Sequence, residues 1–256
     1  MSLPVHVVPS LEGVAVGSAV EVTGDEAHHA VAVRRLRVGE SVVLTDGAGR
    51  AVTGEVAGTG KRVFTVDVAS VDEAARPEPE LVVVQALPKG DRGELAVEVL
   101  TEIGVARIVP WAAARSVAVW KGERAVKSLA RWRSTAREAA KQARRSWFPE
   151  VAELATTADV AALVGSASLA VVLHEEASAP LATLEVPTSG PVVVVVGPEG
   201  GLTEEEVAAF VAAGATSVRL GAEVLRTSTA GLAAAAALLA RTPRWQRGGA
   251  GSATGR

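Results

Sequence analysis

Five consecutive valines at residues 192–196 are the feature that most restricts how this chain can fold. A strand that is apolar at every position must be covered on both faces, as the strands of parallel sheets in α/β proteins are. Residues 81–84 have the same character. From residue 81 onward, strand-like and helix-like segments alternate, which predicts an α/β region with a mostly parallel sheet. The expected strands are 81–86, 107–110, 169–173, 192–196 and 217–220, and the expected helices are 91–103, 123–146, 203–213 and 227–241.

The N-terminal part of the chain follows a different pattern of short strands separated by turn signals. A spacing of about ten residues between such strands predicts a small β-barrel, interrupted by one short helix over 25–37. The acidic, proline-containing stretch 72–80 is a candidate linker. We therefore expect a barrel over residues 1–74, an α/β domain over 75–245 and a flexible tail over 246–256. The expected barrel strands are 19–23, 41–45, 51–57 and 62–70.

Composition excludes several classes of protein. The chain has 256 residues and no cysteine, which rules out disulfide frameworks and thiolate metal sites. The N-terminus shows no secretory signal pattern, and the longest apolar run, 233–240 with Leu232 just before it, is far shorter than the roughly 20 residues that a bilayer requires. We expect a cytoplasmic protein that does not contact a membrane.

Positive charge is concentrated in one segment of an acidic protein. The net charge is −3, yet residues 115–147 contain 10 basic and 2 acidic side chains, a local charge of +8. On a helix, the basic side chains of this segment fall opposite a stripe of apolar ones. Two interpretations stay open, a solvated surface or a face that contacts phosphate. The apolar stripe comprises Leu129, Trp132, Ala136, Ala139, Ala140 and Ala143.

The sequence GPEGG at residues 197–201 directly follows the valine run. Thr203 and Glu206 form a capping box, so the run, the loop and the next helix place these glycines at the carboxyl end of a buried strand. The loop lacks the lysine of a Walker A motif and the spacing of GxGxxG. Three acids, Glu204 to Glu206, argue against phosphate and favour an uncharged or cationic ligand. An ordinary strand–helix turn is the other interpretation.

Three more polar segments follow expected strands. They are 85–92 (QALPKGDR, with TEIGV at 101–105), 173–176 (LHEE) and 220–230 (LGAEVLRTSTA). Four such loops at strand ends would converge on one pocket.

In combination these motifs resemble the RsmE family. The resemblance is carried by GPEGG, LGxxVLRTxTA, QALPKxxR…TEIGV and REAAKQARR at 137–145, and by His29 and residues 33–36, which look like the family pattern H-x3-V-[LR]-R-x. Members are SPOUT-class methyltransferases that use S-adenosylmethionine to methylate N3 of a uridine in small-subunit (16S) ribosomal RNA. The resemblance implies a PUA-like barrel followed by a trefoil-knotted domain, and a homodimer.

The resemblance also implies which residues hold the cofactor, largely through backbone groups. This sequence departs from the common family form at Ala222, where proline is usual, at Glu223, where arginine is common, and at Ser228, where glutamate is common. The implied cofactor residues are Leu173, His174, Gly197, Pro198, Glu199, Gly200, Gly201, Leu220, Gly221, Val224, Leu225 and Arg226.

Methylation at N3 requires loss of the N3 proton, and charge then develops on the uracil carbonyl oxygens. Arg226 is the first candidate to stabilise that charge, with Lys89 and Arg92 next; a structural bond to nearby carbonyls is the alternative role for Arg226. His174 is a candidate proton acceptor, although its place in a cofactor loop favours packing or a backbone-linked role. Glu199 is expected to brace its loop. No metal is expected.

RNA binding would combine arginines of the barrel with the basic helix. Few aromatic residues are available as stacking platforms, and core packing is the expected role of Trp111, Trp120 and Trp147. The expected partners are small-subunit ribosomal RNA or the assembled small ribosomal subunit, and a second copy of the chain. The candidate RNA-binding residues are Arg34, Arg35, Arg37, Lys89, Arg92, Arg131, Arg137, Lys141, Arg144 and Arg145.

Two alternative functions stay open. The chain could be a SPOUT methyltransferase that acts on a ribose 2′-hydroxyl or on another base. It could also be a non-catalytic RNA-binding or ribosome-assembly protein, an alternative that Glu223 and Ser228 keep open.

Overall fold

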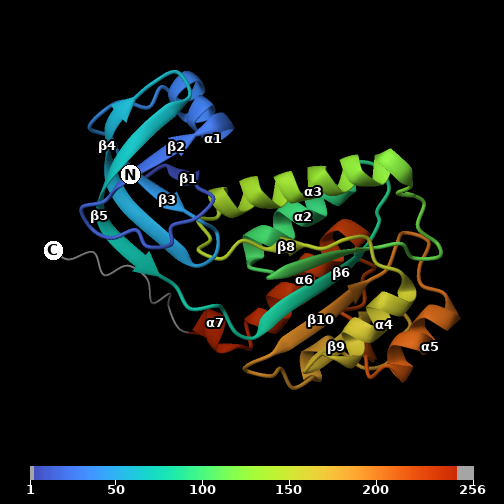
Figure 1. Cartoon of the computed structure of the whole chain (residues 1–256). Helices are drawn as coiled ribbons and strands as arrows, with labels where there is room; N and C mark the ends of the chain where they lie inside the picture. Colours follow the sequence, from blue (N-terminus) through green and yellow to red (C-terminus); the bar gives the residue numbers. More distant parts are fainter. Residues whose placement is uncertain (1–2, 247–256) are drawn as a thin grey trace. The chain divides into compact units, whose positions relative to one another are not determined.

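The computed structural model describes residues 3–246, which divide into two compact units (Figure 1). Unit 1 comprises Met1–Arg76 and Ala140–Phe148, and unit 2 comprises Pro77–Ala139 and Pro149–Arg256. The sequence did not indicate that the segment 140–148 groups with the N-terminal residues. Of the expected tail, all but Gln246 lies outside the described residues.

Unit 1 is built around a curled sheet of five strands in the order β1-β3-β4-β5-β2 (Figure 1). The predicted strands are all present, two of them with the predicted bounds, and β1 is an addition. Alternate side chains of the strands turn inward, and Leu44, Val52 and Phe64 are almost fully buried in the core. The strands are β1 Val5–Val7, β2 Ala19–Thr23, β3 Ser41–Thr45, β4 Arg50–Thr59 and β5 Val63–Glu73.

The helix expected over 25–37 is shorter than predicted. Helix α1 covers Gly24–His28 and continues as a π-helical turn, η1, over His29–Val33. The chain then leaves the helix because Arg35 adopts a left-handed conformation with φ of 57°. Exposed arginines therefore follow an irregular corner and do not lie on a regular helix.

Unit 2 contains a six-stranded parallel sheet in the order β11-β9-β10-β6-β7-β8. The valine run forms β10 in the interior of the sheet, hydrogen-bonded to β6 on one side and to β9 on the other. The predicted parallel sheet is therefore confirmed. The strands are β6 Glu80–Ala86, β7 Arg107–Trp111, β8 Glu150–Val151, β9 Leu169–Leu173, β10 Pro191–Val196 and β11 Thr216–Val218.

Helices cover both faces of this sheet (Figure 1). Val83 and Val194 belong to a core shared with α2, α3 and α6, whereas Val84 and Val195 belong to a core shared with α4 and α5. Adjacent residues thus point to opposite faces, which explains why every position of β10 is apolar. The helices are α2 Arg92–Ile103, α3 Gly122–Gln142, α4 Thr157–Gly165, α5 Glu204–Ala212 and α6 Thr227–Leu239, with the short η2 Leu181–Thr183 and α7 Pro243–Gln246.

Helix α3 ends four residues before its predicted end at residue 146. The predicted apolar stripe is buried as far as Ala140, but Ala143 is exposed because the helix has already stopped. Arg144 takes a left-handed φ of 52°, and the next residues, Trp147 and Phe148, pack against the β3–β4 turn of unit 1. Tertiary packing therefore overrides the helical pattern at this end.

Within residues 3–246, no helix combines the length and the hydropathy that crossing a membrane would require.

Candidate functional site

Four of the predicted loops lie at one edge of the unit 2 sheet. Strands β11, β9, β10 and β6 are neighbours in the sheet and run in the same direction, so their carboxyl ends meet at the same edge. The loops that follow them contain the predicted segments 220–226, 173–174, 197–201 and 87–92. Open parallel sheets bind ligands at this edge.

The glycine loop has a defined conformation. Gly201 has a φ of +74°, and its N–H donates to the carbonyl of Pro198 at 3.0 Å. Thr203 caps α5 through its hydroxyl, which accepts from the N–H of Glu206 at 3.2 Å. The loop between β10 and α5 is thus closed by hydrogen bonds at both ends.

Glu199, which lies within the glycine loop, connects it to the loop after β6. Its Oε1 atom accepts a hydrogen bond from the N–H of Lys89 at 3.2 Å and lies 3.9 Å from Nη1 of Arg92. A carboxylate held in this way braces one loop against another and is poorly placed to act as a free base.

Two further residues make contacts at the site that the sequence did not indicate. The sequence placed Glu206 only in the capping box with Thr203, which the structure confirms, and it did not select Arg115. Glu206 is 4% exposed, and its carboxylate accepts from the N–H of Ala114 at 2.7 Å and from the N–H of Thr203 at 2.9 Å. Arg115 donates from Nη1 to the carbonyls of Gly200 at 3.4 Å and Leu202 at 3.2 Å. The loop after β7, which the sequence did not select, therefore contacts the glycine loop. The only signal for it was that Arg115 begins the basic segment.

Gln85 is a third residue that the sequence named only as part of a motif. It is fully buried at the end of β6, and its Nε2 atom donates to the carbonyls of Ala86 at 3.1 Å and Thr227 at 3.3 Å. A polar side chain in an otherwise apolar strand is the signal that could have singled it out. It ties β6 to the first turn of α6.

His174 is half-buried and is bound through its backbone. Its N–H donates to the carbonyl of Val218 at 2.9 Å, and its own carbonyl accepts from Ala177 at 3.2 Å. These bonds fix the end of β9 against β11. Leu173 is half-buried beside it, as the last residue of β9.

The loop after β11 is open to solvent. Residues 221–226 are all exposed, and Val224 and Leu225 are 75% and 41% exposed although both are apolar. Arg226 occupies the N-cap position of α6. Within the described residues its guanidinium has no hydrogen bond or ion pair, so the structure shows no structural bond for it there. Ser228 is buried in the first turn of α6, and Glu223 is exposed.

The start of α5 is acidic. Glu204 and Glu205 are exposed, and the pKa of Glu205 is lowered by a hydrogen bond from its own backbone N–H, by the Thr203 hydroxyl and by the charge of Arg115. Ionised carboxylates beside the glycine loop repel phosphate and attract a cation.

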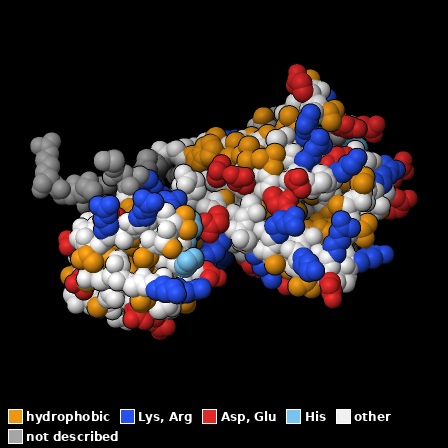
Figure 2. Space-filling model, turned by 90° about the horizontal axis from the view of Figure 1, so that it is seen from above, with side chains coloured by type: hydrophobic (Ala, Val, Ile, Leu, Met, Phe, Trp, Pro, Cys, Tyr) orange, Lys and Arg blue, Asp and Glu red, His pale blue; other side chains and the backbone are white. Residues whose placement is uncertain are grey.

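Two of the candidate RNA-binding residues of α3 have acidic partners. Arg131 contacts Glu94 at 3.3 Å, and Lys141 is bound to Glu26 at 2.9 Å with only 14% of its side chain exposed. On the face of unit 2 drawn in Figure 2, basic side chains accordingly stand among acidic ones. The high charge of the segment 115–147 is thus partly compensated by carboxylates from distant parts of the sequence.

The other candidate RNA-binding residues differ in exposure. Arg145 is half-buried, and its backbone N–H donates to the carbonyl of Ala140. The exposed ones are Arg34, Arg35 and Arg37 of unit 1, Lys89, Arg92 and Arg137 of unit 2, and Arg144 at the end of the basic segment.

The three tryptophans considered as stacking platforms are in packed positions. Trp111 is fully buried against Phe210, and Trp120 lies edge-on to Trp132 with ring centroids 5.0 Å apart. Trp147 lies against Gly49 and donates to the carbonyl of Ala74 at 2.8 Å.

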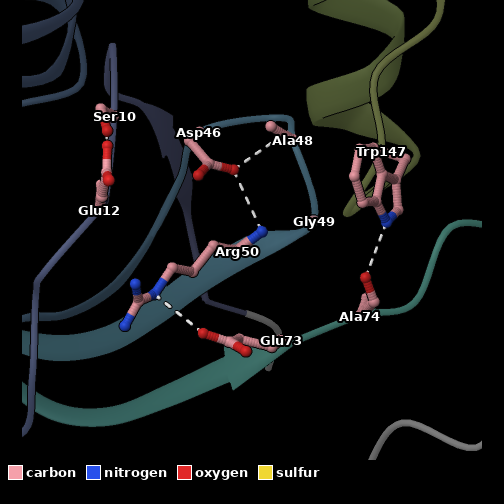
Figure 3. Close-up of a pocket in the computed structure, with 9 residues that line it drawn as sticks. All are labelled: Ser10, Glu12, Asp46, Ala48, Gly49, Arg50, Glu73, Ala74 and Trp147. Atoms are coloured by element: carbon pink, nitrogen blue, oxygen red, sulfur yellow. Dashed lines mark hydrogen bonds and ion pairs between the residues drawn. The ribbon is translucent and has the colours of Figure 1, made fainter.

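Unit 1 has a separate open pocket of about 420 Å³ (Figure 3). Trp147 forms one wall, and the charged side chains around it are three carboxylates and the guanidinium of Arg50. Arg50 pairs with Glu73 at 3.5 Å, and Asp46 accepts from two backbone N–H groups of its own turn. The excess of carboxylates makes this pocket unsuitable for RNA phosphate.

Comparison with known proteins matches the two parts of the chain to two family models. An RNA methyltransferase domain matches residues 76–239, and an RNA methyltransferase PUA domain matches residues 22–68. The ribosomal RNA small subunit methyltransferase E of Mycobacterium tuberculosis is 42% identical over 233 residues, covering 90% of this chain and 89% of that protein. The Bacillus subtilis protein of the same name is 30% identical over 229 residues, covering 86% and 90%.

Solved structures agree with these matches. The ribosomal RNA small subunit methyltransferase E of Neisseria gonorrhoeae, bound to S-adenosylmethionine, has a TM-score of 0.82 and 30% identity, covering 93% of this chain and 97% of that one. A Legionella pneumophila protein in complex with the same cofactor has a TM-score of 0.85 and 27% identity, covering 94% and 99%.

Proposed function

The chain belongs to the family of ribosomal RNA small subunit methyltransferases E, and from this we propose that it transfers a methyl group from S-adenosylmethionine to N3 of a uridine in small-subunit ribosomal RNA. It is an S-adenosylmethionine-dependent methyltransferase with a PUA-like unit and a SPOUT-class α/β unit. One observation carries the proposal for the site. Four loops meet at one edge of a parallel sheet, and the central loop is pinned by its neighbours.

The residues at this edge fit a donor with an adenosyl group and a positive charge. The glycine loop offers backbone groups and little steric bulk, and the acids at the start of α5 favour a cation over a phosphate. The residues that would hold the donor are those of the loops after β9, β10 and β11. When bound, the sulfonium of the donor supplies an electrophilic methyl group.

Arg226 is the residue that we assign to the reacting uracil. The N3 proton passes to solvent, which leaves negative charge on the O2 and O4 atoms, and a guanidinium can donate to either oxygen. The exposed Arg226 side chain has no partner within the described residues, so its donors are available. Its backbone is fixed as the N-cap of α6, which limits the positions that the guanidinium can reach.

The exposed arginines of unit 1 and two exposed residues of the basic segment, Arg137 and Arg144, are proposed to bind the RNA backbone. Arg34, Arg35 and Arg37 follow the irregular corner after η1, and all three are exposed. We further propose that the enzyme acts in the cytoplasm as a homodimer, and that residues 1–74 and 75–245 are its functional domains.

The test is product analysis. Purified protein and isotopically labelled S-adenosylmethionine are incubated with small ribosomal subunits, or with naked small-subunit RNA, from cells that lack this enzyme. The RNA is then digested to nucleosides and analysed by mass spectrometry. Label in 3-methyluridine is the expected result, and the two RNA preparations show whether the substrate is the assembled subunit or naked RNA.

Other products would contradict the uridine N3 assignment in a specific way. Label in a 2′-O-methyl nucleoside would show a ribose methyltransferase, because the transferred methyl group would then be on the sugar and not on the base. RNA binding without donor binding or label would show a non-catalytic RNA-binding protein.

A further inference from the structure

The loop between β7 and α3, which is not one of the four predicted loops, holds the glycine loop. Ala114 and Arg115 lie in it, immediately after the end of β7 at Trp111. Both contact the segment from Gly200 to Glu206. Two adjacent residues of the β7–α3 loop therefore make its contacts with the site.

Arg115 fixes two carbonyl groups of the glycine loop. The carbonyls of Gly200 and Leu202 both accept from its Nη1 atom. The N–H groups of the same two peptides are also bound, that of Gly201 to the carbonyl of Pro198 and that of Thr203 to Glu206. Both peptide planes are thus held at each end, which leaves the loop little freedom to rotate.

Gly200 has no side chain because Arg115 occupies the space. A Cβ atom at position 200 would lie 3.0 Å from both Cβ and the carbonyl oxygen of Arg115. These distances are tighter than ordinary van der Waals contact, and one of the two atoms is backbone. The loops are therefore fitted against each other by shape as well as by hydrogen bonds.

The backbone directly before Arg115 is held by a buried carboxylate. Glu206 accepts from the N–H of the preceding residue, Ala114, at 2.7 Å and is 4% exposed. Because the backbone of this loop is anchored to α5, the guanidinium of Arg115 reaches the glycine loop from a backbone of fixed position. A charged hydrogen-bond donor whose backbone is held in place can impose one conformation on its acceptors.

We propose that Arg115 is a positioning residue for the methyl donor, which holds the glycine loop in the conformation that binds the donor's adenosyl part. This inference rests on the proposed function, since it takes the glycine loop as the donor site. It assigns to the basic segment a role at the donor site, separate from contact with RNA.

The experiment compares Arg115→Met with the control Lys121→Met. Both remove one exposed basic side chain from the same segment, but Lys121 makes no hydrogen bond or ion pair with the glycine loop within the described residues. Calorimetric titration with S-adenosylmethionine is expected to show about tenfold weaker binding for Arg115→Met and unchanged binding for the control. Arg115→Lys, which can reach one carbonyl, should restore part of the affinity.

Steady-state kinetics and amide exchange separate positioning from general damage. For Arg115→Met, KM for the donor should rise while KM for RNA changes no more than it does in Lys121→Met. Without the donor, the amides of Gly201 and Thr203 should exchange faster in the variant, while those of β10 keep their rates.

Three results would overturn the inference. Equal donor affinity in Arg115→Met and the wild type would show that the guanidinium does not position the loop. Weaker RNA binding with unchanged donor binding would make Arg115 an RNA contact. If Arg115→Met does not fold, Arg115→Gln replaces it, and wild-type donor affinity in that variant would also overturn the inference. A wild-type protein that binds no donor would instead contradict the proposed function together with the inference.

Discussion

Arg226 is the residue on which the proposed chemistry depends most directly. Replacing it with methionine removes the donors that we assign to the uracil oxygens, while its place as the N-cap of α6 depends on the backbone. Removal of one such donor lowers kcat by about a hundredfold in comparable sites. We expect a loss of that size for Arg226→Met, with donor affinity within a few-fold of the wild type. A variant that keeps its kcat would exclude Arg226 from the reaction.

Gly49 is required by the packing of Trp147. Its φ is +99°, and a Cβ atom there would lie 2.5 Å from the Trp147 ring. Gly49→Ala should therefore destabilise the protein by about 3 kcal/mol, from backbone strain and from displacement of the ring. Gly13→Ala is the matched control, because Gly13 also has a positive φ of +73° but nothing within 4 Å of the added atom. It should lose about 1 kcal/mol in urea unfolding, and equal losses would refute the role of the ring.

Glu26 makes the stability of unit 1 depend on pH. Burial opposes its ionisation, but hydrogen bonds from His6 and Lys141 and their charges outweigh burial and lower its pKa from 4.5 to about 2. A lowered pKa adds stability that is fully present above pH 4.5 and is lost as the pH falls to about 2. We expect this contribution to be about 1–2 kcal/mol after solvent screening.

Urea unfolding of Glu26→Gln across that range checks this expectation. The stability difference between wild type and variant should shrink as the pH falls from 4.5 toward 2. Glu21→Gln, which removes an exposed carboxylate from the same unit, is the control. A difference that does not change with pH would refute the linkage.

Among single residues, those that belong to local motifs could be predicted from the sequence. Glu199 was found with its loop, and the structure gives it hydrogen-bond partners. The contacts of Arg115 with Gly200 and of Glu206 with Ala114 were not predicted, because these partners lie 85 and 92 residues away in the chain and no local pattern encodes such contacts. Lys141 was selected for its charge, but its half-buried carboxylate partner, Glu26, comes from α1.

Among the elements, α5 and α4 begin with the same capping box in two different environments. Glu206 closes the box of α5 and is buried, whereas Asp159 closes the box of α4 in an exposed position. Glu206→Gln should lose about 1–2 kcal/mol of stability, because one of its two backbone partners loses its acceptor inside the protein. Asp159→Asn should lose less, since water can replace the missing bond. Thermal unfolding of both variants gives the comparison, and an equal loss would show that burial of Glu206 is unimportant.

The elements themselves could largely be predicted from apolar pattern. The doubly buried strands β6 and β10 and the capped helix α5 lie within one residue of their expected bounds at each end. Helix α4 was missed although it has nine residues and a capping box like α5, because no strand was expected directly before it that would locate its start. Helix α3 was extended too far because nothing in its pattern shows that Trp147 packs elsewhere.

For the whole molecule, the change from barrel to α/β pattern does not show all that each of the two units contains. Residues 140–148 group with unit 1 although the first three of them are the end of α3, most of which belongs to unit 2. The reason is physical, because Trp147 and Phe148 cover the glycines of the β3–β4 turn and Lys141 neutralises Glu26. Residues 140–148 are therefore part of the packed structure of unit 1.

That assignment predicts how damage to the segment is distributed over the full chain. Trp147→Ala removes a ring that packs on Gly49 and bonds to Ala74, and about 3 kcal/mol of stability should be lost from unit 1. Native-state hydrogen exchange should then accelerate about a hundredfold in β3 and β4 and stay unchanged in β6 and β10 of unit 2. Trp245→Ala, at a 50% exposed tryptophan of α7, is the control and should leave the exchange of both units as it is. Faster exchange in β6 and β10 with β3 and β4 unaffected would show that the segment stabilises unit 2 instead.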